Sequence, residues 1–392
     1  MKTIRCILKA GKEKPLEGHH PWVFSGAIDR IDEDYATGDL VKVYSAQDRF
    51  LGIGYLNPRS QIAIRMLVFQ DIPVDEHFFA KRVRRAIDLR YPFLPPDTNA
   101  YRLVHSEGDF LPGLIVDRYA DYLVVQFQTA GIEKWRDVII RTLGEALGPK
   151  GIYEKNDTDH RETEGLEKRS GVLAGEEPPN YVEIKEYGIK FAVDLKSGQK
   201  TGFFLDQREN RKKVGMASAQ KRVLNCFAYT GGFGVVAAKW GASETVSVEA
   251  SEAALNTART NYELNGLTGP AFQFVKADVF EYLRSVRQEF DVVVLDPPAF
   301  CKHKAQVMQA SRGYKDINLS ALRLLAKGGL LFTYSCSSHI DPDLFQKIVF
   351  GAAKDTHKKV RILEKTSHGF DHPINIYHPE GEYLKGLVCQ VF

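Results

Sequence analysis

Apolar and polar positions follow a strand-like pattern at the beginning of the 392-residue chain. Residues 1 to about 73 contain short apolar or alternating runs between turn residues, among them DLVKVYSAQ, FLGIGYL and QIAIRMLVF. Runs of this length and period are typical of strands. We therefore predict a small β-barrel over residues 1–73.

The pattern becomes helical directly after Pro73. Apolar residues recur every three or four positions in DEHFFAKRVRRAIDLR and again in IEKWRDVIIRTLGEALG, and GLIVDRYADYLVVQFQ between them reads as a hairpin. These elements predict a central α+β domain over residues 74–180. Its last part, residues 157–180, is polar and charged, and we interpret it as a flexible loop or linker.

The third region, residues 181–392, starts with a hairpin in YVEIKEYGIKFAVDL. From about residue 220, apolar strands such as RVLNCF, TVSVEA, FDVVVLDPP and LLFTYSCSS alternate with helical segments. Such alternation predicts an α/β fold with a doubly wound, mostly parallel sheet, whose ligands bind at the carboxyl ends of the strands.

Composition narrows the class of protein. The chain is 44% hydrophobic and 26% charged, lacks an apolar run long enough to span a bilayer, and begins without the apolar core of a signal peptide. Its five cysteines are widely spaced and form no CxxC pair or zinc pattern. We therefore predict a cytoplasmic protein with free thiols, no structural metal and no membrane segment. The net charge of +3 is too small to indicate a nucleic-acid partner by itself.

A nucleotide-like cofactor is predicted at the start of the doubly wound sheet. Glycines in NCFAYTGGFG permit a tight turn, and the next helix presents free amides. Glu249 ends the second strand, where an acid accepts hydrogen bonds from ribose, and Asp278 ends the third, where a carboxylate can meet the amine of adenine. The predicted cofactor-binding residues are Asn225, Phe227, Tyr229, Thr230, Gly231, Gly232, Glu249, Ser251, Asp278, Val279 and Asp296.

The fourth strand argues against a NAD-linked dehydrogenase, which shares the first two of these features. LDPPAF places Asp296 and two prolines at the strand end. Because proline has no amide hydrogen, carbonyls and a carboxylate are left to face the cleft. This arrangement suits a flat base that carries donors better than it suits a nicotinamide.

The combination of NCFAYTGGFG, Glu249, KADVF, DPPAF, SRGYKDIN and SCS resembles the bacterial ribosomal RNA large subunit methyltransferase I family. HPWVFSGAI resembles the start of that family's PUA RNA-binding domain, and KTGFFLDQREN resembles the segment before its catalytic sheet. The resemblance implies a PUA domain, a central α+β domain and a class I methyltransferase domain. It also implies S-adenosylmethionine as cofactor and C5 of a cytosine in 23S rRNA, naked or in a pre-50S particle, as target. A homodimer stays open.

Cys336 in SCS is the predicted nucleophile for that chemistry. C5 of cytosine is a poor nucleophile, so its methylation needs a covalent partner at C6, and a thiolate is the suitable side chain. Asp296 would hold the base edge and stabilise the developing charge. Cys226 reads as a core residue and Cys301 as an incidental loop thiol, because Ala299 stands where many such enzymes carry a second cysteine. Predicted substrate-binding residues are Pro297, Pro298, Phe300, Arg312 and Tyr314.

Two further alternatives remain from the sequence. A methyltransferase acting on a ring or exocyclic nitrogen, for example of guanine, needs no covalent intermediate; Ala299 and Cys336 argue against it. A non-catalytic RNA-binding assembly factor is the alternative from another class, and the intact acidic residues and Cys336 argue against that. The histidines at 339, 368, 372 and 378 read as surface or loop residues.

Overall fold

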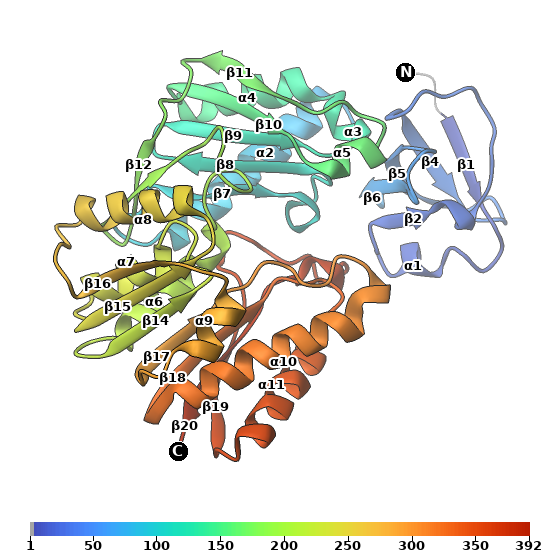
Figure 1. Ribbon diagram of the computed structural model, residues 1–392. Coiled ribbons are helices and arrows are strands. Elements are labelled where there is room, and N and C mark those ends of the chain that lie inside the picture. Colours follow the sequence, from blue (N-terminus) through green and yellow to red (C-terminus); the bar gives the residue numbers. More distant parts are fainter. Residues whose placement is uncertain (1–3) are drawn as a thin grey trace. The chain divides into compact units, whose positions relative to one another are not determined.

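The computed structural model describes residues 4–392 (Figure 1). The chain divides into two compact units. Unit 1 contains the residues up to Ile184 together with Val193–Phe203 and Phe370–Gly381. Unit 2 contains Lys185–Ala192, Phe204–Gly369 and Glu382–Phe392.

The first sheet of unit 1 is built from the short strands that the sequence pattern predicts. Its six strands lie in the order β2-β6-β5-β4-β1-β3, with β1 parallel to β4 and the other described pairs antiparallel. Apolar side chains of these strands and Leu16 of helix α1 (Lys14–Glu17) form its core. The strands are β1 (Ile4–Leu8), β2 (Trp22–Phe24), β3 (Ile28–Ile31), β4 (Leu40–Tyr44), β5 (Phe50–Leu56) and β6 (Ile62–Val68).

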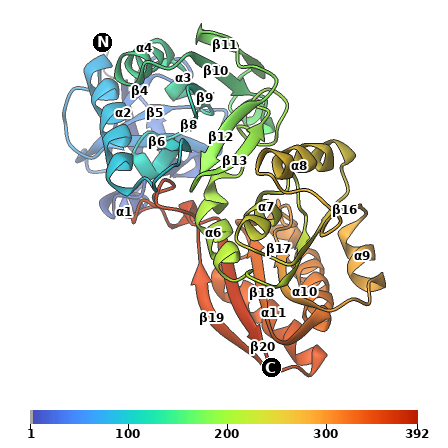
Figure 2. The same ribbon diagram turned by 90° about the vertical axis from the view of Figure 1, so that its left-hand side faces the viewer.

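The second sheet of unit 1 has five strands in the order β11-β10-β9-β8-β7. Figure 2 labels four of them, β8 to β11. Apolar residues of two helices, α2 (Glu76–Arg90) and α4 (Arg136–Leu147), join those of its strands in one core. Asp75 caps α2 by accepting a hydrogen bond from the Phe78 amide at 2.9 Å. The remaining elements are β7 (Ala100–His105), β8 (Leu114–Tyr119), β9 (Tyr122–Phe127), β10 (Gly151–Asn156) and α3 (Ala130–Glu133).

Residues 157–180 are not the loop or linker that their composition predicts. They contain helix α5 (Asp159–Thr163) and strand β11 (Arg169–Gly175), which pairs antiparallel with β10. β11 is an edge strand whose side chains are mostly exposed, so the strand carries no apolar alternation. The prediction of a flexible loop or linker was wrong because main-chain hydrogen bonds with β10 hold residues of this segment in the sheet.

Unit 2 contains a seven-stranded sheet in the order β16-β15-β14-β17-β18-β20-β19. The five strands β14 to β18 are mutually parallel, and β20 runs antiparallel to both of its neighbours, β18 and β19. The predicted doubly wound sheet is confirmed, and its strand order reverses between β14 and β17. Its strands are β14 (Arg222–Cys226), β15 (Glu244–Glu249), β16 (Phe272–Lys276), β17 (Phe290–Leu295), β18 (Leu325–Ser335), β19 (Val360–Thr366) and β20 (Lys385–Val391).

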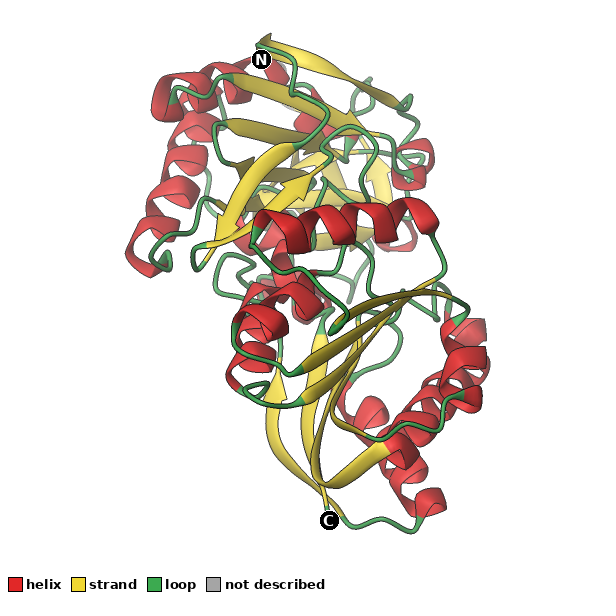
Figure 3. Cartoon of the chain, turned by 60° about the vertical axis from the view of Figure 1, so that its left-hand side comes forward, coloured by secondary structure: helices red, strands yellow, loops and turns green. Residues whose placement is uncertain are grey.

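Helices cover both faces of this sheet (Figure 3). One core joins the strands to α9, α10 and α11, and another joins them to α6 and α7. No helix within residues 4–392 is long and apolar enough to cross a membrane. The helices are α6 (Arg208–Met216), α7 (Gly232–Lys239), α8 (Glu252–Leu264), α9 (Val279–Ser285), α10 (Val307–Leu324) and α11 (Pro342–Thr356); the hairpin of β12 (Val182–Glu186) and β13 (Ile189–Val193) forms a separate sheet.

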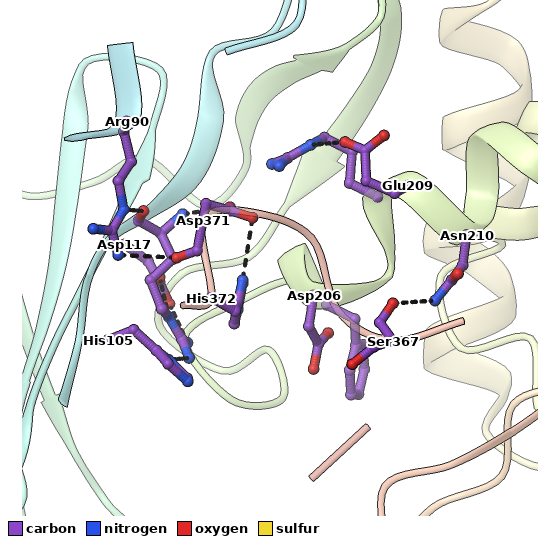
Figure 4. A network of polar contacts seen from close by, with 12 residues as sticks. Arg90, His105, Asp117, Asp206, Glu209, Asn210, Ser367, Asp371 and His372 are labelled. Carbon is purple, nitrogen blue, oxygen red and sulfur yellow. Dashed lines mark hydrogen bonds and ion pairs between the residues drawn. The ribbon is translucent and has the colours of Figure 1, made fainter. Parts of the chain in front are cut away.

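A buried ion pair in unit 1 holds a segment that comes from near the end of the chain. Arg90, which is fully buried, binds both carboxylate oxygens of Asp109 at 2.6 Å. Its Nη2 also donates to the carbonyl of Asp371 at 3.0 Å, and the Arg102 amide donates to the Asp371 carboxylate at 2.9 Å (Figure 4). Segment 370–381 is thereby part of unit 1.

Two of the histidines predicted to be surface or loop residues belong to this segment. His372 and His378 lie in a loop, but both are buried. The His372 ring packs 5.0 Å from that of His105, and the His378 ring packs 4.4 Å from that of Trp22. Polar and proline-rich sequence therefore concealed a packed segment.

Substitution of Arg90 by leucine should strongly destabilise the protein, because it leaves the Asp109 carboxylate buried without its cation. We expect a loss of about 3–5 kcal/mol in the free energy of unfolding, measured by urea titration with tryptophan fluorescence. Arg84→Leu is the matched control on the same helix. Its partner Glu145 lies 2.9 Å away and both side chains are about half exposed, so the loss should stay below about 1 kcal/mol. Equal losses of unfolding free energy in the two variants would contradict the role of Arg90 as the cation that compensates the buried Asp109 carboxylate.

Candidate active site

The carboxyl ends of the central parallel strands of unit 2 bring the predicted site residues to one edge of the sheet. In register, Cys226 of β14 lies opposite Val248 of β15 and Leu295 of β17, and Leu295 lies opposite Thr333 of β18. The residues that follow these positions are Phe227, Glu249, Asp296 and Tyr334. This edge is the switch point at which doubly wound sheets bind ligands.

The glycine-rich turn after β14 has an unusual backbone. Phe227, Tyr229 and Gly231 have φ angles of +57°, +47° and +81°. Glu249 supports the turn, since one carboxylate oxygen accepts from the Tyr229 amide at 2.9 Å and the other from the Ser251 amide at 3.0 Å. The first amides of α7 have no partner within that helix. A tight turn, free amides and an adjacent carboxylate are the groups that fit an adenosine-bearing cofactor.

The other predicted cofactor residues occupy different environments. Thr230, Gly232 and Val279 are buried beside the turn and at the start of α9. Asn225 is 1% exposed and faces α7, because a Cβ on Gly234 would lie 3.3 Å from its amide nitrogen. A direct contact of Asn225 with the cofactor stays a prediction.

Two of the predicted cofactor residues also cap helices. Ser251 accepts at 3.3 Å from the Ala254 amide of α8. Asp278 is exposed and accepts at 3.1 Å from the Glu281 amide of α9. Capping uses one carboxylate oxygen of Asp278, so its predicted adenine contact remains compatible with the structure and stays a prediction.

Asp296 is held by a side chain that sequence reasoning did not assign to the site. Gln207 donates to one Asp296 oxygen at 2.9 Å, and Asn210 donates to the Gln207 carbonyl oxygen at 2.6 Å. Asn210 also reaches the Ser367 carbonyl at 3.2 Å (Figure 4). Both amides lie in the segment KTGFFLDQREN, whose resemblance to the family was the available signal. They orient the Asp296 carboxylate.

Cys336 lies in the segment Ser335–Ser337, where β18 ends and the chain leads into a turn; we call this segment the cysteine turn. Ser335 and Ser337 are fully buried, whereas Cys336 between them is partly exposed, as expected when successive side chains of an extended chain point to opposite sides. The Ser337 hydroxyl contacts the Tyr314 hydroxyl at 2.9 Å and accepts from the Cys301 amide at 3.1 Å. The serines therefore anchor the turn in the core and leave the thiol at its surface.

The cysteine turn lies against the residues that follow β17. The sulfur of Cys336 is 4.0 Å from the carbonyl oxygen of Pro297, directly after Asp296. The two predicted catalytic residues thus follow neighbouring strands, and the Cys336 sulfur lies against the residue after Asp296.

The remaining predicted substrate residues divide between core and surface. The rings of Phe300 and Tyr314 lie 4.6 Å apart, next to Phe227 and Phe280. Tyr314 is fully buried, and burial raises the pKa of its phenol. Tyr314 therefore supports Ser337 from inside, while Pro298 and Arg312 are exposed. Contacts of these residues with a substrate stay predictions.

Cys336 differs from the other four cysteines, which are all buried. Burial raises the pKa of the Cys226 thiol, and that of Cys389 to about 12. Cys301 is 1% exposed and its sulfur lies 3.3 Å from the His303 carbonyl. A buried thiol with a raised pKa is a weak nucleophile, so the position of Cys336 favours it for covalent chemistry.

The sheet order, in which antiparallel β20 lies between β18 and β19, the glycine-rich turn and the acid at the second strand end fit a class I S-adenosylmethionine-dependent methyltransferase. A family model of S-adenosylmethionine-dependent methyltransferases matches residues 160–371, and one of PUA-like domains matches residues 6–69. The chain belongs to the ribosomal RNA large subunit methyltransferase I family. The predicted family, fold class and cofactor are confirmed, and the NAD-linked alternative is excluded.

Relatives match the chain from end to end. Ribosomal RNA large subunit methyltransferase I of Photobacterium profundum is 47% identical over 395 residues, covering 99% of this chain and 100% of the relative. The protein of the same name from Aeromonas salmonicida is 48% identical over 393 residues and 99% of each chain. A structure described as a SAM-dependent methyltransferase from Streptococcus mutans has a TM-score of 0.85 and 27% identity over 99% of this chain and 100% of its own. A methyltransferase complexed with SAH has a TM-score of 0.87, at the same identity and coverage.

Substitution of Glu249 by glutamine should weaken cofactor binding, because a charged acceptor for the ribose hydroxyls becomes neutral. We expect the dissociation constant for S-adenosylmethionine, measured by calorimetry, to rise about tenfold. Glu252→Gln, on the neighbouring first turn of α8, is the control and should leave it unchanged. An unaltered affinity of Glu249→Gln for S-adenosylmethionine would show that Glu249 does not bind the ribose.

Proposed function

We propose that this protein methylates C5 of a cytosine in 23S rRNA through a covalent bond between Cys336 and C6 of the base. One observation carries the proposal: the partly exposed thiol is at the end of β18, with its sulfur 4.0 Å from the main chain that follows Asp296. The names of the relatives support ribosomal RNA as the substrate. The thiol argues against the alternatives of nitrogen methylation and of a non-catalytic assembly factor.

The reaction starts when the Cys336 thiolate adds to C6. A lone pair of the thiolate forms the new S–C6 bond, and the π electrons of the C5–C6 double bond are displaced into the ring toward N3, which makes C5 nucleophilic. S-adenosylmethionine, when bound, would supply the methyl group for C5 from its sulfonium sulfur, which becomes a neutral thioether. Removal of the C5 proton by a base then re-forms the double bond and expels the Cys336 thiolate. The net change replaces one proton with one methyl group.

Asp296 holds the base in this scheme. Its carboxyl group accepts a hydrogen bond from the amino group of cytosine and, when protonated, donates one to N3, where negative charge develops as C6 is attacked. Gln207 at 2.9 Å fixes one of its oxygens, so little reorganisation accompanies the reaction. Pro297 and Pro298 keep this strand end rigid.

The target cytosine has to reach the site unpaired. A base within a duplex is inaccessible, so it must be single-stranded or flipped, at a cost of about a few kcal/mol. Naked rRNA and a pre-50S particle both stay proposed substrates.

Three further features stay proposals. They are domain boundaries at residues 73 and 180, a cytoplasmic location and a homodimer.

The PUA-like domain supplies RNA affinity in our proposal. A cavity of about 550 Å³ on it is lined by Lys12, Lys14, Trp22 and Phe24, and Phe24 is 52% exposed. We call it the PUA groove. Lysines that neutralise phosphates and aromatic rings on which bases stack are the combination that single-stranded RNA requires.

Reversal of the charges in the PUA groove should weaken RNA binding without affecting the cofactor. For Lys12→Glu/Lys14→Glu we expect about tenfold weaker binding of an rRNA fragment near 0.1 M salt, and a salt dependence flatter by about one to two units of slope. Arg30→Glu/Lys42→Glu changes the charge of the same domain equally, outside the groove. An equal loss of RNA affinity in both double variants would show that the positive charge of the domain contributes to binding but that the PUA groove is not the binding site.

The covalent step can be trapped with rRNA transcribed from 5-fluorocytidine, because the fluorine blocks the release step. We expect a denaturation-resistant protein–RNA complex with wild type and with Cys301→Ala, but none with Cys336→Ala. Cys301→Ala is the matched control, since this thiol lies in the same part of the structure but is buried. Methyl transfer to ordinary rRNA without any trapped complex would favour a nitrogen target.

A further inference from the structure

A buried lysine lies directly behind the cysteine turn. Lys385 is the first residue of β20 and is 5% exposed. It pairs in register with Ser335, the residue before Cys336. Its ammonium donates to the carbonyl of Ser337, the residue after Cys336, at 2.6 Å. The lysine therefore spans the main chain on both sides of the thiol.

The position of Lys385 needs a reason beyond packing. An ammonium group has three donors, and its transfer from water to the protein interior is costly unless acceptors or an opposite charge compensate. One carbonyl satisfies one donor. A thiolate at Cys336 would provide a nearby negative charge at the moment when the proposed reaction requires it.

The charges around Lys385 are consistent with this pairing. Burial lowers the pKa of Lys385 to about 8, while Cys336, Asp341 and Glu382 act in the opposite direction. Asp341 caps α11, and Glu382 precedes β20. From α10, the Tyr314 phenol faces the turn, and burial raises its pKa, so it stays neutral. Asp296 follows β17. The carboxylates oppose ionisation of the Cys336 thiol, and the Lys385 ammonium favours it.

We propose that Lys385 is a positioning residue for Cys336: its ammonium holds the cysteine turn through the Ser337 carbonyl and stabilises the thiolate form of the nucleophile. The description of Cys336 as a nucleophile rests on the proposed function, but the effect of Lys385 on the thiol does not. The thiol proton leaves to solvent, and the ammonium acts on the resulting negative charge from behind the cysteine turn, where it binds the Ser337 carbonyl.

Alkylation by iodoacetamide tests this directly, because only thiolates react and Cys336 is the cysteine of the five that is not buried. The full-length protein is alkylated between pH 6 and 10, without RNA or cofactor, and the Cys336 peptide is quantified by mass spectrometry. Lys385→Gln keeps a donor for the Ser337 carbonyl but removes the charge. We expect its alkylation midpoint to rise by about one pH unit, with a rate about tenfold lower near pH 7.

Two further variants separate charge from packing. Lys385→Arg retains the cation and should keep the wild-type midpoint. Lys358→Met is the matched control, because Lys358 donates to the carbonyls of Leu322 and Leu325 at 2.7 and 2.8 Å, at the opposite end of β18. It should leave the midpoint unchanged.

An unchanged midpoint in a folded Lys385→Gln protein overturns the proposal, and so does an equal rise in Lys385→Arg. Near-ultraviolet circular dichroism reports folding, and Lys385→Met replaces the glutamine variant if that one does not fold, with the same rise expected. The trapping experiment with 5-fluorocytidine distinguishes the effect of Lys385 on the thiol from the proposed covalent reaction of Cys336. A shifted midpoint without a trapped complex would keep the effect of Lys385 and remove the proposed reaction.

Discussion

The arrangement of the candidate active site depends on the main-chain pairing of β18 with its two neighbours, of which β17 runs parallel to it and β20 runs antiparallel. Parallel pairing with β17 places Leu295 opposite Thr333, and antiparallel pairing with β20 places Ser335 opposite Lys385. A slip of one residue would turn every side chain of a strand to the other face. Because these strands are covered on both faces by apolar cores, the register is strongly determined. Asp296, Cys336 and Lys385 are neighbours for this reason.

The polar groups of the cysteine turn replace apolar packing at one point of that core. Ser335, Ser337 and the Tyr314 hydroxyl are fully buried, and each unpaired buried polar group is costly. Here the Ser337 hydroxyl has Tyr314 and the Cys301 amide as partners, and its carbonyl has Lys385. Satisfied networks of this kind are rigid. The thiol is thereby presented at the surface of the core by a turn with little freedom to move.

The sequence was sufficient for the features that follow from period and strand order. Glu249, Asp296 and Cys336 were predicted because each ends a parallel strand, and carboxyl ends of such strands meet at one edge. Lys385 was not predicted to belong to the site, because it starts an antiparallel strand and the register of that strand depends on pairing that no local sequence pattern reveals. Gln207 precedes the sheet in a short helical turn and gives no periodic signal. β11 was missed because an exposed edge strand lacks apolar alternation.

The membership of segment 370–381 in unit 1 has a consequence for synthesis of the chain. Asp371 is made 281 residues after Arg90, its partner in the buried network. At translation rates of about 5–20 residues per second, the interval between them is roughly 15–55 s. During that time the remainder of unit 1 emerges without the segment that covers Arg90, His105 and Trp22. An N-terminal domain usually completes its fold before the rest of the chain is made, whereas this one has to wait for residues that follow nearly all of the methyltransferase sheet.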